Sequence, residues 1–324
     1  MHRLATLALL WATASACTPP CATQQGSQAC RVRGPEGWRP LSMHVPSTDA
    51  DTPTPLVLNL HGGGGSGASQ EIESEMTPFA EEHGFIVVYP TAGKAADGKH
   101  RWNSGPRTTE GRQSTADDVA YLKAVIDEME RLYAIDTARI YVTGLSNGAQ
   151  MAYRFACEAE DRVAATAPVA GAMVIGSCTL DQPMPMLLIH GTADAFVPYE
   201  GGPSDPALGE AGVDEDQRPI PETAALWAEL DGCASTPEVT FQQGEATCQT
   251  WRPCSGGAEV QLCTIDGGGH NWPGSEAYPV GASPFGRALA SLVADHWPGH
   301  VTQDLRANEA VWSFFQRFER SPTP

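Results

Sequence analysis

The stretch Arg139-Ile-Tyr-Val-Thr-Gly-Leu-Ser-Asn-Gly148 joins an apolar, strand-like run to a serine that stands between two glycines. Residues 147–157 after it are predicted to form a helix. A G-x-S-x-G pattern between a strand and a helix is typical of a sharp turn that lifts the serine hydroxyl clear of a sheet, and only glycines leave room for it. The helix N-terminus adds partial positive charge where an oxyanion would form. The pattern predicts Ser146 as a nucleophile; a chance glycine-rich turn is the alternative.

A serine hydroxyl is a weak nucleophile, so it needs a base that a carboxylate orients. Where such a turn serves hydrolysis, the chain order is serine, acid, histidine, each after a later strand. Asp194 follows a predicted strand at 186–189, and His270 follows a predicted strand at 260–265 and a glycine turn. We therefore expect Asp194 as the acid and His270 as the base. Less well placed are Asp181, Asp214, Asp216, Asp266 and His190, the last of which is expected to order its own turn.

A second glycine-rich loop lies earlier, in Leu56-Val-Leu-Asn-Leu-His-Gly-Gly-Gly-Gly-Ser-Gly67. It satisfies the dinucleotide pattern G-x-G-x-x-G, but that fold wants an acid ~20 residues further on, and residues 87–91 carry none. A Walker loop would need Gly-Lys-Ser/Thr, which is absent. The loop instead suits an oxyanion hole, in which one N–H comes from Gly62 or Gly63 and the other from Asn147, the residue after the nucleophile. A purely structural turn is the alternative.

The remaining pattern is an alternation of strands and helices. Strands are predicted at 56–60, 85–89, 139–143, 166–170, 186–189, 248–252 and 260–265, and helices at 71–83, 117–133, 147–157, 222–230 and 308–318. This alternation predicts an α/β fold whose mainly parallel sheet is covered by helices on both faces. We divide the 324-residue chain into a signal peptide (1–16), a flexible tether (17–37), one catalytic domain (38–319) and a tail (320–324).

Charge and the N-terminus indicate where the chain works. It carries 20 Lys+Arg against 39 Asp+Glu, a net charge of -19, which disfavours nucleic acid and anionic membranes as partners. A basic start, a short apolar run and the Ala14-Ser-Ala16 site are typical of a cleaved export signal. We expect a secreted protein, either free or held by lipid at Cys17, with an ester substrate as its partner and no protein partner implied.

From about Trp38 to Phe318 the chain resembles the polyhydroxybutyrate depolymerase/feruloyl esterase family of secreted α/β-hydrolases, the lipoprotein-type esterases among them. The matching stretches are His61-Gly-Gly-Gly-Gly-Ser-Gly67, Arg101-Trp-Asn103, Asp117-Asp-Val119, Tyr141-Val-Thr-Gly-Leu-Ser-Asn-Gly148, Ala167-Pro-Val-Ala-Gly171, His190-Gly-Thr-Ala-Asp194, Val197-Pro-Tyr-Glu-Gly-Gly202 and Gly267-Gly-Gly-His-Asn-Trp-Pro-Gly274. The resemblance implies an α/β-hydrolase fold without a large lid domain and the same triad. It leaves the ester open among polyester, feruloyl and acetyl substrates. Ala149 departs from the family, where a second glycine is common.

Nine cysteines in an exported chain predict disulfides. The family resemblance supports a bridge between Cys157 and Cys178. Cys248 and Cys263 lie on two neighbouring strand-like runs, where a cross-strand bridge is plausible. The remaining cysteines would then pair as Cys233 with Cys254 and Cys21 with Cys30, which leaves Cys17 unpaired. Eight cysteines allow 105 connectivities, so the other pairings stay open.

The mechanism that follows is serine ester hydrolysis through an acyl-enzyme, with no metal and no organic cofactor. An acyltransferase on the same scaffold and a catalytically silent binding domain are the rival functions. Trp102 and Trp272 are predicted to line the substrate cleft, with ordinary packing as the alternative. His296 and His300 are four apart, but Pro298 breaks the helix that would align them on a metal.

Overall fold

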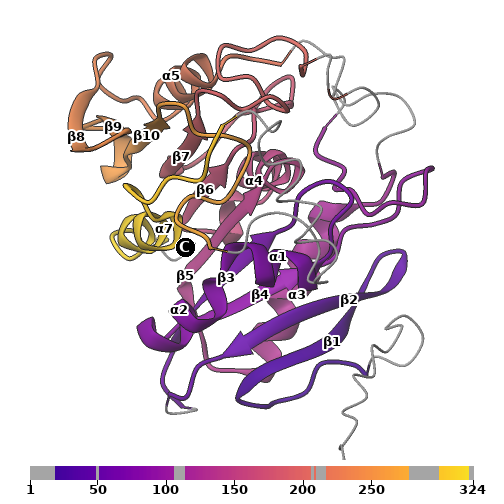
Figure 1. Cartoon of the computed structure of the whole chain (residues 1–324). Helices are drawn as coiled ribbons and strands as arrows, with labels where there is room; N and C mark the ends of the chain where they lie inside the picture. Colours follow the sequence, from indigo (N-terminus) through magenta and orange to yellow (C-terminus); the bar gives the residue numbers. More distant parts are fainter. Residues whose placement is uncertain are drawn as a thin grey trace, which may run out of the picture.

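The computed structural model describes residues 19–48, 51–105, 114–205, 208, 217–276 and 299–320. Its centre is a sheet whose strands follow the order β1-β2-β4-β3-β5-β6-β7-β10-β9-β8 (Figure 1). The strands are β1 (Gly26–Gly34), β2 (Gly37–Val45), β3 (Thr54–Leu60), β4 (Ile86–Pro90), β5 (Ile135–Leu145), β6 (Ala165–Val169), β7 (Met186–Gly191), β8 (Glu238–Gln243), β9 (Ala246–Trp251) and β10 (Val260–Ile265).

The middle of the sheet, from β4 through β3, β5, β6 and β7 to β10, is parallel, and both edges are antiparallel. The central strands β3, β4, β6 and β7 are buried along their whole length. Strands buried on both faces read as continuous apolar runs, which is why the sequence revealed them. The parallel sheet predicted from the sequence is therefore confirmed.

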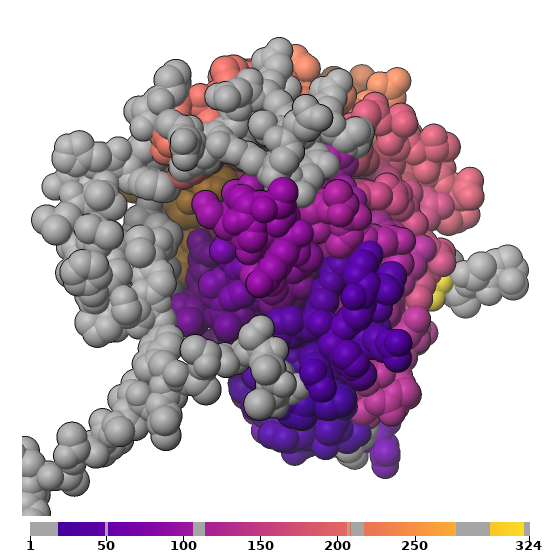
Figure 2. Space-filling model, turned by 90° about the vertical axis from the view of Figure 1, so that its right-hand side faces the viewer, coloured from indigo at the N-terminus to yellow at the C-terminus, as the bar shows by residue number. Residues whose placement is uncertain are grey.

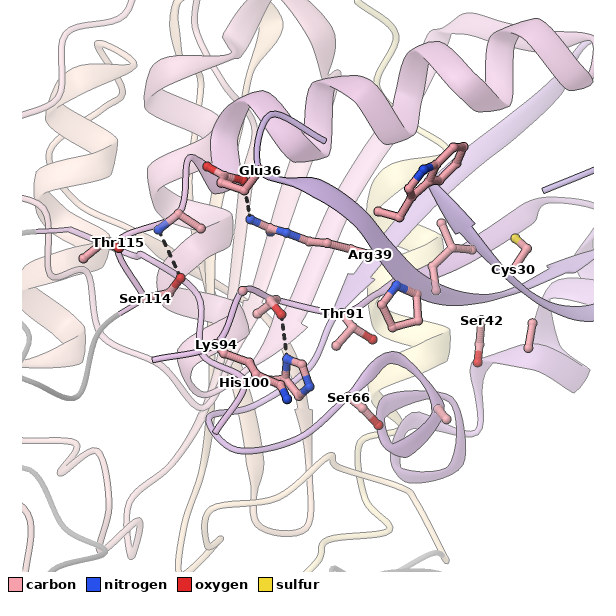
Figure 3. Close-up of a pocket in the computed structure, with 18 residues that line it drawn as sticks. Cys30, Glu36, Arg39, Ser42, Ser66, Thr91, Lys94, His100, Ser114 and Thr115 are labelled. Carbon is pink, nitrogen blue, oxygen red and sulfur yellow. Dashed lines mark hydrogen bonds and ion pairs between the residues drawn. The ribbon is translucent and has the colours of Figure 1, made fainter. Parts of the chain in front are cut away.

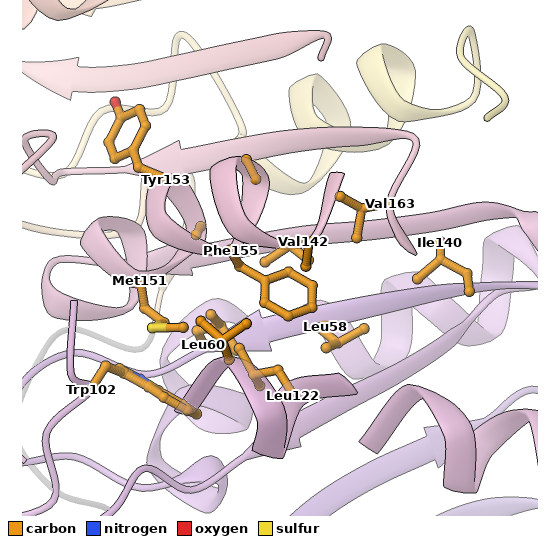
Figure 4. Close-up of a cluster of buried hydrophobic side chains, with 14 of the residues drawn as sticks. Leu58, Leu60, Trp102, Leu122, Ile140, Val142, Met151, Tyr153, Phe155 and Val163 are labelled. Carbon is orange, nitrogen blue, oxygen red and sulfur yellow. The ribbon is translucent and has the colours of Figure 1, made fainter. Parts of the chain in front are cut away.

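Helices cover both faces of this sheet. They are α1 (Gly67–Ser74), α2 (Met76–His83), α3 (Asp118–Leu132), α4 (Asn147–Glu158), α5 (Ile220–Leu230) and α7 (Ala307–Phe315), with short 3-10 turns at Glu160–Arg162 and Ser255–Gly257. One apolar cluster joins α3, α4 and α5 to the sheet, and Phe155 and Leu122 lie in it with Leu58 (Figure 4). A second cluster joins α2 and α7 to the opposite face through Ala80 and Phe314.

The predicted flexible tether at 17–37 is wrong for residues 26–34, which form β1. This strand pairs along its whole length with β2, and Cys30 and Val32 are its two buried hydrophobic residues. A half-buried edge strand needs few apolar side chains, so its Pro-, Gln- and Gly-rich surroundings concealed it. The edge strand β8 was missed for the same reason, because every one of its residues is exposed.

The helix predicted at 71–83 is two helices, α1 and α2, which meet at Glu75. The backbone of Glu75 takes a left-handed conformation, with φ 50°. Asn308 of α7 donates its side-chain N–H to the carbonyl of Ser74 at 2.8 Å, so a distant segment satisfies the end of α1. Local periodicity could not reveal this break. The predicted signal peptide and Cys17 lie outside the described residues.

All four disulfides considered above are present: Cys21–Cys30, Cys157–Cys178, Cys233–Cys254 and Cys248–Cys263. The last joins directly opposed residues of β9 and β10. Four bridges fit an oxidising compartment such as the extracellular space. Among the described residues, we find no helix that combines the length and the apolar character needed to cross a bilayer.

Candidate active site

Ser146 stands at the turn between β5 and α4, with φ 56° and ψ −119°. A non-glycine residue rarely adopts this conformation, so the surrounding packing must impose it. Gly148 shows how tight the packing is, because a Cβ there would lie 2.1 Å from the carbonyl oxygen of Leu60. The strained turn expected from the G-x-S-x-G pattern is therefore present.

Asp194 and His270 follow the ends of β7 and β10, and the two strands pair in parallel. The turns beyond them touch, since Ala193 donates its N–H to the carbonyl of Gly268 at 2.9 Å. The Nδ1 of His270 lies 2.7 Å from Oδ2 of Asp194. A ring nitrogen facing a carboxylate carries the proton, which leaves Nε2 of His270 free to accept one. The predicted pairing of these two residues is present.

Both oxygens of the Asp194 carboxylate have hydrogen-bond or ion-pair partners. Its Oδ1 accepts the backbone N–H groups of Phe196 and Val197, both at 2.9 Å. His190 lies 3.3 Å from Oδ2 through its Nε2, which also donates to the carbonyl of Val197 at 2.8 Å. His190 thus orders the turn after β7, as expected from the sequence. Asp266, the nearest rival acid, is exposed and accepts from Thr192 instead.

The electrostatics of the pair suit a base held by an ionised acid. Burial would raise the pKa of Asp194, but the attraction and hydrogen bonds of His270 and His190 hold that pKa well below its usual range. Burial would lower the pKa of His270, but the Asp194 carboxylate and the nearby Glu73 raise it above its ordinary value. The charged form of His270 is therefore stabilised, as a general base requires when it takes up a proton.

The glycine loop lies directly beside Ser146, because a Cβ on Gly62 would sit 3.5 Å from the Ser146 Cβ. In the loop, the N–H of Gly64 donates to the carbonyl of His100 and that of Gly65 donates to the carbonyl of Gly62. Within the described residues, the N–H groups of Gly62 and Gly63 have no such partner. These are the two amides that the sequence proposed for an oxyanion hole.

The carbonyl of Gly62 distinguishes the two amides. It accepts from Gly65 at 3.0 Å and faces Nδ1 of His61 at 2.7 Å, so it points into the loop. In a trans peptide the following N–H points the opposite way. The N–H of Gly63 therefore points out of the loop, and Gly63 packs beside Asn147, since a Cβ on Gly63 would lie 3.6 Å from the Asn147 Cβ. This favours Gly63 as the loop donor.

Asn147 is the first residue of α4, where a helical N–H has no partner within the helix. Its side chain has a separate task, which the sequence did not reveal. The Oδ1 of Asn147 accepts the N–H of Trp102 at 2.7 Å, and Nδ2 donates to the carbonyl of Trp102 and to the hydroxyl of Ser104. Asn147 thus clamps residues 102–104 against the start of α4.

The prediction that Trp102 and Trp272 line a cleft is wrong, because both indole rings are buried. Trp102 donates its ring N–H to the carbonyl of His61 at 2.9 Å, and Trp272 donates to Asn308 at 3.0 Å. Both rings therefore brace the segments around the site. The alternative of ordinary packing is the correct one.

Two residues beside His270 escaped the sequence reasoning. The centroid of the Phe196 ring lies 4.9 Å from that of the His270 ring. The charge of Glu73, in α1, raises the pKa of His270. Burial raises the pKa of Glu73 to about 7. Phe196 stands two residues after the predicted acid, which is the one signal that could have pointed to it. Glu73 comes from a helix more than a hundred residues earlier, so no local motif announces it.

His300 pairs with Glu245 at 2.6 Å, while His296 lies outside the described residues. Across the described parts of the chain, no group of three or more His, Cys, Asp and Glu side chains is arranged to hold a metal ion. The described structure thus holds a serine hydroxyl on a strained turn beside the glycine loop, and an imidazole paired with a buried carboxylate.

Comparison with known proteins places the chain in context. Residues 40–182 match the family model described as esterase polyhydroxybutyrate depolymerase. Feruloyl esterase B of Piromyces equi is 33% identical over 214 residues, covering 63% of this chain and 37% of the relative. A putative esterase, NocK, of Nocardia uniformis subsp. tsuyamanensis is 33% identical, covering 64% of this chain and 62% of the relative.

Poly(3-hydroxyalkanoate) depolymerase C of Paucimonas lemoignei is 27% identical, covering 65% of this chain and 53% of the relative. The chain thus spans between about a third and two thirds of the length of these relatives. Among solved structures, acetyl xylan esterase from Aspergillus awamori superposes with a TM-score of 0.56 at 18% identity, over 76% of this chain and 94% of that one. At that identity the superposition establishes the α/β-hydrolase fold.

Proposed function

Because the chain belongs to the polyhydroxybutyrate depolymerase and feruloyl esterase family of α/β-hydrolases, we propose that it is a serine carboxylic-ester hydrolase with Ser146, Asp194 and His270 as its triad. The observation that carries the proposal is the strained Ser146 turn, which shares the carboxyl edge of one parallel sheet with the Asp194–His270 pair. Parallel strands end at the same edge, so β5, β7 and β10 deliver all three side chains there.

In the proposed mechanism His270 takes the proton from Ser146 through Nε2 as the serine oxygen attacks the ester carbonyl. The amides of Gly63 and Asn147 donate to the oxyanion, and each such donor contributes ~2.7–4 kcal/mol of transition-state stabilisation. The alcohol leaves with the proton from His270. Water then attacks the acyl-enzyme, with His270 again as base, and releases the acid and free Ser146.

The substrate class belongs to the same proposal. The relatives are named for feruloyl esters and hydroxyalkanoate polyesters, and another, from Neocallimastix patriciarum, is a bifunctional acetylxylan esterase/xylanase. We take the substrates to be soluble feruloyl, acetyl or short 3-hydroxybutyrate-type esters. The Phe196 ring beside His270 gives an acyl group an apolar surface. We also propose that the protein is exported to the extracellular space, where it is either free or anchored by lipid at Cys17.

A panel of hydrolysis rates tests this function. Methyl ferulate, acetylated xylan, short p-nitrophenyl esters and 3-hydroxybutyrate oligomers are assayed with and without an added alcohol acceptor. Release of free acid in proportion to enzyme supports a hydrolase. Transfer to the alcohol without free acid would make the protein an acyltransferase, and no turnover of any ester would make it a silent domain.

A further inference from the structure

A cavity of about 620 Å³ opens between β2, the start of α1 and the hairpin 94–100 (Figure 3). None of the three proposed triad residues lines it. Its volume is in the range of pockets that hold small organic ligands. The same segments lie side by side on the face shown in Figure 2, where β1 and β2 are indigo and the hairpin is purple. No step of the proposed ester hydrolysis uses this cavity.

Hydroxyl groups dominate the polar part of the lining. The side chains of Ser42 and Thr115 have no hydrogen-bond partner within the described residues. Thr91 accepts the N–H of Gly67 at 3.0 Å, and Ser114 accepts the N–H of Ala116 at 3.1 Å, so each keeps its own O–H to donate. Such a wall suits a ligand that itself carries many hydroxyl groups.

Trp38 lies at the rim of this cavity, with 48% of its surface exposed. An indole offers a flat apolar surface of considerable area. The guanidinium of Arg31 lies over the indole ring, 5.0 Å from its centroid, so a sugar would have to stack on the opposite face. A sugar ring has an apolar C–H face and a hydroxylated edge, which match the indole and the hydroxyl wall.

The charges of the lining argue against a phosphorylated ligand. Arg39 forms ion pairs with Glu36, at 2.8 Å, and with Asp118, so its guanidinium is already paired. Lys94 is the one lining cation whose side chain makes no hydrogen bond or ion pair in the described chain. Bidentate recognition of phosphate uses an arginine, and Lys94 could supply only a single point charge. A neutral, polyhydroxylated ligand is therefore the better match.

The cavity also touches the supports of the glycine loop. The N–H of Ala92 donates to Nε2 of His61 at 3.0 Å, and the carbonyl of His100 accepts the N–H of Gly64 at 2.7 Å. Both Ala92 and His100 line the cavity. An occupant would thus rest on the segments that hold the proposed oxyanion loop.

We propose that this cavity is a saccharide-binding site, in which a sugar ring stacks on Trp38 and its hydroxyls bond to Ser42, Thr91 and Thr115. The binding itself rests on the lining alone. A second part rests on the proposed function: a saccharide chain esterified with the acyl group to be cleaved is held here while its ester lies at Ser146.

Binding is tested with the Ser146→Ala full-length protein and xylohexaose by isothermal titration calorimetry, with cellohexaose as a second probe. Trp38→Ala is the test variant, and Val239→Ala, which removes another exposed apolar side chain at the far edge of the sheet, is the matched control. We expect binding of at least one hexaose that weakens about tenfold in Trp38→Ala, which corresponds to about 1.4 kcal/mol of lost stacking, and that is unchanged in Val239→Ala. Thermal unfolding checks that both variants fold.

No binding of either hexaose, or equal binding by Trp38→Ala, would overturn the proposal. The active chain tests the second part: Trp38→Ala should raise KM for acetylated xylo-oligosaccharides and leave hydrolysis of p-nitrophenyl acetate unchanged. An equal loss on both esters would overturn the link to turnover. A wild-type chain that binds xylohexaose but hydrolyses no ester would refute the proposed function and leave the saccharide site standing.

Discussion

Replacing Asp194 by Asn changes one atom at the centre of the proposed triad. The turn after β7 should survive, because Oδ1 still accepts the N–H groups of Phe196 and Val197. Those two donors also fix the orientation of the amide, since an NH₂ group facing them would place donor against donor. The new NH₂ group therefore faces His270, where the carboxylate oxygen stood at 2.7 Å.

The amide then donates to Nδ1 of His270, which forces the ring proton onto Nε2. In that tautomer Nε2 cannot take the proton of Ser146, and the imidazolium loses the charge that stabilises it. The same replacement in a serine protease costs ~10⁴ in kcat, and we expect a loss of about 10³–10⁴, about 4–5.5 kcal/mol in activation free energy. This loss of activity would come from the wrong tautomer of His270 and from the missing negative charge at residue 194.

The measurement is the steady-state rate of p-nitrophenyl acetate hydrolysis at neutral pH. Asp266→Asn is the matched control, because Asp266 lies in the turn after β10 but is exposed and bonds to Thr192 rather than to His270. It should keep nearly full activity, and both variants should unfold near the wild-type temperature. A loss smaller than tenfold in Asp194→Asn would refute the assignment of Asp194 as the orienting acid.

Three further predictions concern the surroundings of the site. Because burial raises the pKa of Glu73 to about 7, Glu73 is partly ionised near neutral pH, and its charge raises the pKa of His270. Glu73→Gln removes this charge, so the acid limb of the pH–rate profile should move modestly to lower pH; an unmoved limb would contradict this coupling. Burial raises the pKa of Asp231 from 3.8 to about 7, so the free energy of unfolding should fall by about 4 kcal/mol as the pH rises from about 4 to 7. Chemical unfolding of Asp231→Asn should lack this decline, and an unchanged pH dependence in the variant would count against it. Gly148→Ala places a methyl group 2.1 Å from the carbonyl oxygen of Leu60 and should destabilise the fold by about 1–3 kcal/mol or more, measured by denaturant unfolding, whereas a wild-type midpoint would mean that the turn can relax.

The elements around Ser146 could be predicted because their constraints are local. A strand, a glycine-flanked serine and a helix impose one turn, and the chain order of acid and histidine then follows from strands that share an edge. The Cys248–Cys263 bridge could be foreseen for a similar reason, since neighbouring strands bring opposed residues together.

The failures involve contacts that the local sequence pattern does not show. Trp102 and Trp272 stand close to motif residues in the sequence, but their burial depends on His61 and Asn308, which no local pattern links to them. β1 becomes a strand because β2 pairs with it. Glu73 reaches the site because α1 packs on the sheet beside it.

Labelling with a fluorophosphonate tests the central claim most directly, because the reagent reacts only with a serine whose hydroxyl is activated by a base. We predict one equivalent of label per chain, on Ser146 alone by peptide mapping, with esterase activity lost in step with labelling. Asp194→Asn should react far more slowly. Stoichiometric loss of activity with the label on another residue, or full activity in Ser146→Ala, would contradict the account.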